Sequence, residues 1–197
     1  MNFSRWKEEL EVVEAGLLEL PSGEIVATDP LVYPEAAPFE RTVSAGNYPV
    51  YIYKYQERNA FAELRFSEKE VVSWELATVP GEDPSTLEEG ELFGYGVDTG
   101  LGCFMDETTA MDFDKLLMDA EGMYFDDVLY DLMYTEESDF EDELVLNHRP
   151  WEGRSENVMI FESGWGDGFY ASYWGLDADG EVVTLVTDFG VVDPEEE

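Results

Sequence analysis

Three consecutive runs in the first half of the chain alternate side chains between two faces, and this pattern constrains the fold more than any other feature. The runs are YPVYIYKYQ (48–56), NAFAELRFS (59–67) and EVVSWELATV (70–79). In the first run, Val50 and Ile52 share one side of an extended chain, because successive side chains of a strand point to opposite faces. Short polar connections separate the runs, so we expect an antiparallel meander with one face in the core.

Further strands are predicted on both sides of this region. Residues 17–33 are typical of two short strands around the turn PSG. Near the other end, NVMIFE (157–162), FYASYWGLD (169–177) and EVVTLVTDFGVV (181–192) each have the pattern of a strand. The intervening SGWGDG and DADG contain Asp-Gly pairs, which favour tight reversals because glycine tolerates positive φ. We therefore expect a second, three-stranded meander here.

One segment has the period of a helix instead. Apolar residues recur there at i, i+3, i+4 and i+7, so one stripe can dock on a sheet. The stripe comprises Phe113, Leu116, Leu117 and Ala120, and after Gly122 the same spacing recurs at Phe125, Val128, Leu129 and Leu132. Thr109, three residues before Asp112, resembles a capping arrangement. Two helices or one kinked helix fit this spacing equally well.

These patterns together predict an α+β fold. We expect an antiparallel β-rich core, built as two packed sheets or one strongly bent sheet, with a helical insertion over about 108–135. The chain has 197 residues, which is enough to bury a sizeable core. A chain of this length favours one domain over 1–197.

The charge of the chain limits what it can bind. Forty-seven acidic residues against ten basic ones give a formal net charge of −37, while a hydrophobic content of 44% still supports folding. Direct binding to nucleic acid is not expected, because phosphate contacts need lysine and arginine. An anionic membrane surface is disfavoured for the same reason. Three explanations stay open: solubility or adaptation to salt, a surface complementary to a basic protein, and carboxylate-rich cation binding.

The acidic residues are concentrated in one region. Residues 106–145 hold fifteen Asp or Glu and one Lys, a local net charge of −14. Such a run is usually a solvated face or a mobile loop. It is also the part of the chain best suited to meet a basic partner. The candidate acidic surface comprises Asp112, Asp119, Asp126, Asp127, Asp131, Glu136, Glu137, Asp139, Glu141 and Asp142.

Several features predict a soluble cytoplasmic protein. No apolar run approaches the roughly 18 residues that cross a bilayer. The first residues, MNFSRWKEELEVVEAG, lack the apolar core of a secretory signal. Cys103 is the single cysteine, so no internal disulfide can form, which fits a reducing compartment.

The catalytic and metal-binding motifs are incomplete. Asp98-Thr99-Gly100 is the tripeptide of aspartic proteases, but those enzymes need two such carboxylates, and no second copy occurs. DADGE (177–181) begins like a calcium loop, yet its flanks are predicted strands and a hairpin turn fits better. One histidine and one cysteine exclude a His-rich zinc site, and the apolar surroundings of Cys103 favour a buried, inert thiol. His148 and the residues after it are predicted as a loop that anchors Trp151 in a groove. We expect no catalytic residue, no metal site and no cofactor.

Aromatic, glycine and acidic residues recur in three segments, 96–106, 162–174 and 187–190, and could build a pocket. Alternation places Tyr170 and Trp174 on one face of their strand, opposite Phe169 and Tyr173. Two interpretations stay open. Either some of these rings line a groove, or both faces of the sheet are covered and all of the rings belong to the core. The candidate pocket residues are Asp98, Thr99, Asp106, Glu162, Trp165, Asp167, Tyr170, Trp174 and Asp188.

Three motifs in this order resemble a bacterial family known as domain of unknown function 4241. They are LPSGEIVATDPLV, GYGVDTGLGCFMD and ESGWGDGFYASYWGLDADGEVVTLVTDFG. The resemblance implies a bacterial cytoplasmic protein, largely β, with no established activity. It also implies recurring glycines and aspartates that either form a site or specify turns. These are Asp29, Gly96, Asp98, Gly100, Asp106, Gly164, Gly166, Asp167, Gly168 and Asp188.

Two functional hypotheses follow. The first is a non-catalytic acidic intracellular binding protein, for example an inhibitor or immunity-type partner of a basic toxin or of a nucleic-acid-binding protein. The second is an enzyme or small-ligand-binding protein that uses the candidate pocket. Convergence of Asp98, Asp167 and Asp188 beside Trp165 would favour the second hypothesis.

Overall fold

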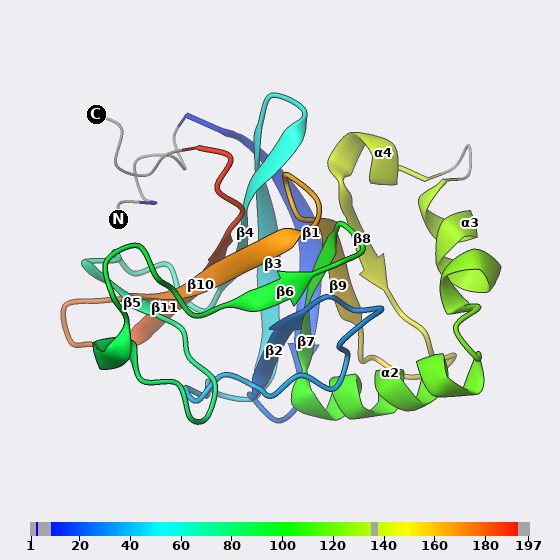
Figure 1. Ribbon diagram of the computed structural model, residues 1–197, viewed down its shortest axis with the longest axis horizontal. Coiled ribbons are helices and arrows are strands. Elements are labelled where there is room, and N and C mark those ends of the chain that lie inside the picture. Colours follow the sequence, from blue (N-terminus) through cyan, green and yellow to red (C-terminus); the bar gives the residue numbers. More distant parts are fainter. Residues whose placement is uncertain (1–2, 4–8, 135–137, 193–197) are drawn as a thin grey trace.

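A computed structural model describes residues 3, 9–134 and 138–192 of the chain. Two antiparallel sheets pack face to face, and a helical layer lies on one side of them (Figure 1). The predicted fold class, α+β with a β-rich core and a helical insertion, is therefore confirmed.

Strands account for most of the regular structure, and the helices lie mainly between β7 and β8. The strands are β1 (Glu11–Leu20), β2 (Ile25–Thr28), β3 (Gly46–Tyr55), β4 (Arg58–Arg65), β5 (Ser73–Leu76), β6 (Tyr95–Val97), β7 (Leu101–Asp106), β8 (Val145–His148), β9 (Val158–Glu162), β10 (Gly168–Leu176) and β11 (Val182–Asp188). The helices are the 3₁₀ turn η1 (Pro84–Thr86), α2 (Glu107–Asp119), the π-helical turn η2 (Phe125–Leu129), α3 (Tyr130–Met133) and α4 (Phe140–Glu143).

The larger sheet has seven strands in the order β1-β3-β4-β11-β10-β5, and β6 also pairs with β10. The smaller sheet has the order β2-β7-β9-β8. The inner faces of both sheets form one core, which includes Ile52 from β3, Phe104 from β7, Phe161 from β9 and Leu185 from β11. Alternation along each strand aims these side chains inward, as the sequence pattern predicts.

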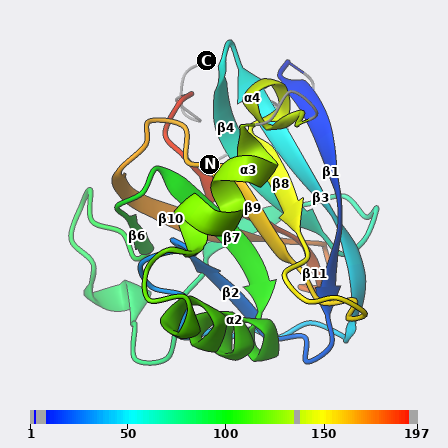
Figure 2. The ribbon, with the colours of Figure 1, turned by 90° about the vertical axis from the view of Figure 1, so that its right-hand side faces the viewer.

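The helical layer covers the outer face of the smaller sheet. In Figure 2, α2 and α3 lie on the viewer's side of β7, β8 and β9. The predicted stripe of α2 makes this contact, with Phe113 fully buried and Leu116 packed beside it. The predicted cap is wrong, however. Asp106 is the N-cap residue and accepts hydrogen bonds from the Thr108 backbone N–H and hydroxyl, whereas the Thr109 side chain is buried.

Two predicted strand pairings are also wrong. The third run forms β5, which pairs with β10 rather than with β4. The predicted C-terminal meander holds only for β10 and β11, because β9 belongs to the other sheet. The SGWGDG turn therefore carries the chain from one sheet to the other instead of closing a hairpin. Strands β7 and β8 were not predicted, although β7 runs between β2 and β9 in the smaller sheet.

The two faces of β10 differ as the alternation predicts. Tyr170 and Trp174 point into the core between the sheets. On the other face Phe169 is 55% exposed, while Tyr173 is half-buried beneath Phe3. Phe3 belongs to a small apolar cluster that covers part of this outer face. Among the described residues, no helix is long and apolar enough to cross a membrane.

Candidate functional site

Two loops that connect the sheets lie side by side. The first joins β6 to β7 and contains Asp98, Thr99 and Gly100, and the second joins β9 to β10. Fully buried Asp29 holds the first loop, because its carboxylate accepts the backbone N–H groups of Asp98 and Thr99 at 2.9 Å. The Ser163 N–H then donates to the Gly100 carbonyl at 3.0 Å and ties the two loops together. The fold therefore brings segments 96–106 and 162–174 together.

The second loop is fixed by its own hydrogen bonds. The carbonyl of Gly166 accepts from the hydroxyls of Ser163 and Tyr170, each at 2.8 Å. Gly164 has a φ of +64°, and a Cβ atom there would lie 2.6 Å from the carbonyl oxygen of Asn59. Glycine is required at this position because both the backbone conformation and the space exclude a side chain.

A cavity of about 280 Å³ opens where these loops meet the helical layer. The loops supply one side of it, and Phe125 and Tyr134 from the helical layer supply another. Its lining residues are Arg58, Thr99, Gly100, Leu101, Phe125, Tyr134, Glu162, Ser163, Gly164, Trp165 and Gly166. Three of the predicted pocket residues, Thr99, Glu162 and Trp165, are thus brought together.

Glu162 is the ionisable acid of this cavity. It ends β9, and its side chain is half-buried. Burial raises the pKa of its carboxyl group, and the nearby charges of Arg58 and Lys54 oppose that shift only in part. Within the described residues, its carboxylate forms no hydrogen bond and no ion pair.

Trp165 forms an exposed wall of the cavity and is held in place on two sides. Its ring is 59% exposed, and its indole N–H donates to the Gly190 carbonyl at 3.0 Å. The Arg58 guanidinium lies over the ring, 4.5 Å from its centre. Segment 187–190 therefore contacts the cavity through Trp165, while the Asp188 carboxylate accepts the Gly190 N–H of its own turn.

The remaining predicted carboxylates lie elsewhere. Asp106 is fully buried at the start of α2, where it also accepts hydrogen bonds from Ser22. Asp98 is exposed and accepts a hydrogen bond from the Tyr33 hydroxyl at 3.3 Å, and this contact raises the pKa of Tyr33. Asp167 is exposed as well. Asp98, Asp167 and Asp188 are not among the residues that line this cavity, so the predicted convergence of these three carboxylates beside Trp165 is not found there.

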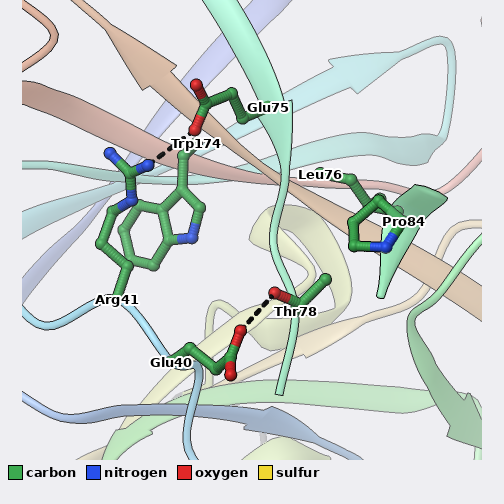
Figure 3. Close-up of a pocket in the computed structure, with 7 residues that line it drawn as sticks. All are labelled: Glu40, Arg41, Glu75, Leu76, Thr78, Pro84 and Trp174. Carbon is green, nitrogen blue, oxygen red and sulfur yellow. Dashed lines mark hydrogen bonds and ion pairs between the residues drawn. The ribbon is translucent and has the colours of Figure 1, made fainter. Parts of the chain in front are cut away.

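Trp174 borders a different cavity, shown in Figure 3, with a volume of about 520 Å³. The Trp174 ring is 2% exposed and packs edge-on against Phe39 in the core. Polar groups around this cavity satisfy one another: Arg41 pairs with Glu75 at 2.6 Å, and the Thr78 hydroxyl donates to Glu40.

Its other lining residues are Leu76 and Pro84 (Figure 3). Its charged groups thus each have a described partner, whereas the carboxylate of Glu162 in the other cavity has none.

The remaining reactive side chains are buried. Burial raises the pKa of the Cys103 thiol, which keeps it protonated, as the sequence predicts. His148 ends β8 rather than lying in a loop, and its Nε2 is 2.8 Å from the Tyr124 hydroxyl oxygen. Trp151 is half-buried against the helical layer, with the Arg154 guanidinium over its ring. Among the described residues, no group of three or more His, Cys, Asp or Glu side chains could hold a metal ion.

The acidic surface lies on the helical layer. Asp119, Asp126, Asp127 and Asp131 are exposed there, as are Asp139 and Asp142 near α4. Asp112 forms ion pairs with Lys115 and Arg154. Glu136 and Glu137 lie outside the described residues, as does the side chain of Glu141.

The same layer also exposes large apolar side chains, which the sequence analysis did not predict. They are Met111, Met118, Met123, Tyr130, Leu132 and Tyr134, with exposed fractions between 43% and 68%. Leu132 was predicted to belong to the buried stripe, and that prediction is wrong, because Leu129 and Met133 are the buried positions of η2 and α3. Arg58 and Phe125 were also missed as cavity residues, because only the fold brings β4 and η2 to this loop pair.

The fold and cavity define a two-sheet α+β protein with a pocket between connecting loops and a helical layer. The chain belongs to the family described as protein of unknown function (DUF4241), whose model matches residues 18–187. The match extends through α2, η2 and α3, so the helical layer lies within the family region. No curated protein and no solved structure matches the chain.

Proposed function

We propose that this protein is a non-catalytic binding protein whose helical layer docks a basic protein. The observation that supports this proposal is the combination of exposed carboxylates with exposed methionine and tyrosine on one layer. Carboxylates such as Asp126 and Asp131 are exposed beside Met123 and Tyr130. Tyrosine and methionine are enriched in protein interfaces, and methionine adapts to partners of different shape.

Charge complementarity identifies the class of partner. A local net charge of −14 attracts cations and repels nucleic acid and anionic lipid. Opposite potentials on two proteins raise the association rate and select the partner. The partner class that fits is a basic protein, such as a toxin or a nucleic-acid-binding protein, and the setting that fits is the bacterial cytoplasm. An immunity-type inhibitor would act by covering the cationic surface of its target.

The test is a comparison of association rates. The chain is used to recover a basic partner from a lysate of its native host in dilute salt, and the purified pair is studied by stopped-flow mixing. In the test variant Asp119, Asp126, Asp127 and Asp131 become Asn. In the matched control, exposed Glu11, Glu57, Glu70 and Glu89 become Gln, so both variants lose the same charge.

We expect the helical variant to associate at least about tenfold more slowly at low salt and to show a flatter salt dependence than the control. Equal association rates for the two variants would overturn the proposal, because the location of the charge would then be irrelevant. Recovery of a partner does not by itself decide the question.

A second candidate function, binding of a small molecule, is supported by the cavity that Thr99, Glu162 and Trp165 line. Its volume of about 280 Å³ lies below the range of roughly 300–1,000 Å³ that is usual for drug-sized ligands. A single side chain or a fragment of similar size fits this space better.

A further inference from the structure

The Glu162 cavity holds a carboxylate whose neighbouring cations are already engaged. Arg58 donates to the Gly164 carbonyl at 2.9 Å and lies over the Trp165 ring. The Lys54 ammonium donates to the Asp142 carbonyl. Neither cation forms an ion pair with Glu162 among the described residues, so their positive charges act on this half-buried anion only from a distance. A half-buried charge without a partner is unfavourable, and a bound cation would relieve the cost.

The walls of the cavity suit a cation as well. Trp165 presents an exposed indole whose ring already contacts Arg58, and Phe125 and Tyr134 add further aromatic rings from the helical layer. Aromatic faces attract lysine and arginine, and a carboxylate beside them supplies the opposite charge. The Trp165 indole N–H is fixed by Gly190, so the ring is already oriented.

The position of the cavity connects it to the acidic helical surface. Phe125 precedes exposed Asp126 and Asp127, and Tyr134 follows α3, which contains Asp131. A basic protein that approached the helical layer would therefore bring its own side chains to the rim of the cavity. The volume suits one long side chain rather than a larger ligand.

We propose that the Glu162 cavity receives one arginine or lysine side chain of the basic partner, with the Glu162 carboxylate as its counter-ion and the aromatic rings as its walls. The inference rests on the proposed function for the source of the cation. It adds an anchor point to a surface that otherwise acts through long-range attraction. Anchors of this kind govern dissociation, whereas exposed surface charges govern association.

The first test needs no partner protein. N-acetyl-arginine amide is titrated into the ¹⁵N-labelled full chain at low ionic strength, with the uncharged N-acetyl-citrulline amide as the matched probe. The readout is the indole N–H cross-peak of Trp165, assigned by its loss in Trp165→Phe. We expect a saturable shift with the arginine probe and none with the citrulline probe.

Glu162→Gln should weaken this binding at least about tenfold, because it removes the counter-ion while preserving the shape. Glu152→Gln, an exposed change outside the cavity, is the control and should leave binding unchanged. Equal shifts for both probes, no shift at millimolar concentrations, or unchanged binding in Glu162→Gln would each overturn the cation site. Glu162→Gln should not unfold the chain, because it removes an unfavourable buried charge.

The second test uses the purified pair and separates the two proposals. Glu162→Gln should raise the dissociation rate at least about tenfold with little change in the association rate. The helical four-residue variant should show the reverse pattern. An unchanged dissociation rate would overturn the anchor while leaving the docking surface intact. Arginine-probe binding that depends on Glu162, in a chain whose helical carboxylates do not affect association, would support the cation site and overturn the docking surface.

Discussion

His148 shows how a single buried side chain can couple the helical layer to pH. Its ring is 3% exposed, lies 2.8 Å from the Tyr124 hydroxyl and packs edge-on against Phe113. Burial lowers the pKa of His148 to about 4, from an ordinary value of 6.5. The unfolded chain therefore binds a proton before the folded chain does, and the free energy of unfolding falls as pH drops from 6.5 toward 4.

We expect the wild-type chain to lose about 2 kcal/mol more stability between pH 7 and pH 4.5 than His148→Gln does, because glutamine takes up no proton. Urea unfolding of both chains at the two pH values measures the difference. Tyr124→Phe is the control. It removes the hydroxyl but keeps the buried histidine, so the pH dependence should persist. Equal losses in the wild type and His148→Gln would contradict burial as the cause.

At the residue scale, two buried carboxylates show what the recurring aspartates of this chain can do. Asp29 and Asp106 are both fully buried, and each accepts several hydrogen bonds from nearby backbone and hydroxyl groups. Both residues lie in motifs that carry the family resemblance, in which the aspartates either form a site or specify turns. Sequence alone does not distinguish a carboxylate that organises a loop from a carboxylate that contacts a ligand, because carboxylates of either kind occur near glycine and threonine. Hydrogen-bond partners distinguish them.

At the element scale, the β9–β10 loop places a strict local requirement on one of its glycines. Gly164 and Gly166 both have positive φ, at +64° and +89°. A Cβ atom on Gly164 would lie 2.6 Å from the Asn59 carbonyl oxygen and 2.8 Å from Phe189, whereas nothing lies within 4 Å of one on Gly166. A residue with a Cβ atom would be strained by positive φ at either position, but only at position 164 would that atom also clash with its neighbours.

We expect Gly164→Ala to lower the free energy of unfolding by at least about 2 kcal/mol more than Gly166→Ala, since only the first adds overpacking to the strain. Parallel urea titrations of the two variants measure this difference. Similar losses for both would mean that positive φ alone determines the cost and that the loop can move aside.

The same loop explains where prediction from sequence fails. Alternation located β3, β4, β10 and β11 well, because side-chain period is a local property of the chain. Pairing is not local. The turn after Glu162 has the composition of a hairpin, yet it joins strands of different sheets. Of the predicted pocket residues, Thr99, Glu162 and Trp165 meet in one cavity because their loops cross between the sheets together, whereas the contribution of Arg58 depends on the position of β4.

At the scale of the whole molecule, charge and layering act together. The core lies between the two sheets, so most carboxylates are left on outer surfaces, and residues 106–145, which include the helical layer, hold −14 of the net −37. The rest of the charge is distributed over the other surfaces. The proposed docking therefore depends on the charge of one layer, whereas the self-repulsion depends on the charge of the entire chain. The two effects can be measured separately, because stability reports the whole charge and association reports its location.

We expect the free energy of unfolding to rise as KCl increases from 0.1 M to 1 M, because the screening length falls from about 10 Å to about 3 Å and the repulsion among carboxylates weakens. Urea unfolding at each salt concentration measures the change. KCl is preferred to a sulfate salt, which would also strengthen apolar burial. The control variant with Gln at Glu11, Glu57, Glu70 and Glu89 should be more stable in dilute buffer and less sensitive to KCl. Stability that is flat with salt in both chains would show that self-repulsion is negligible, and the acidic composition would then have to be explained by binding instead.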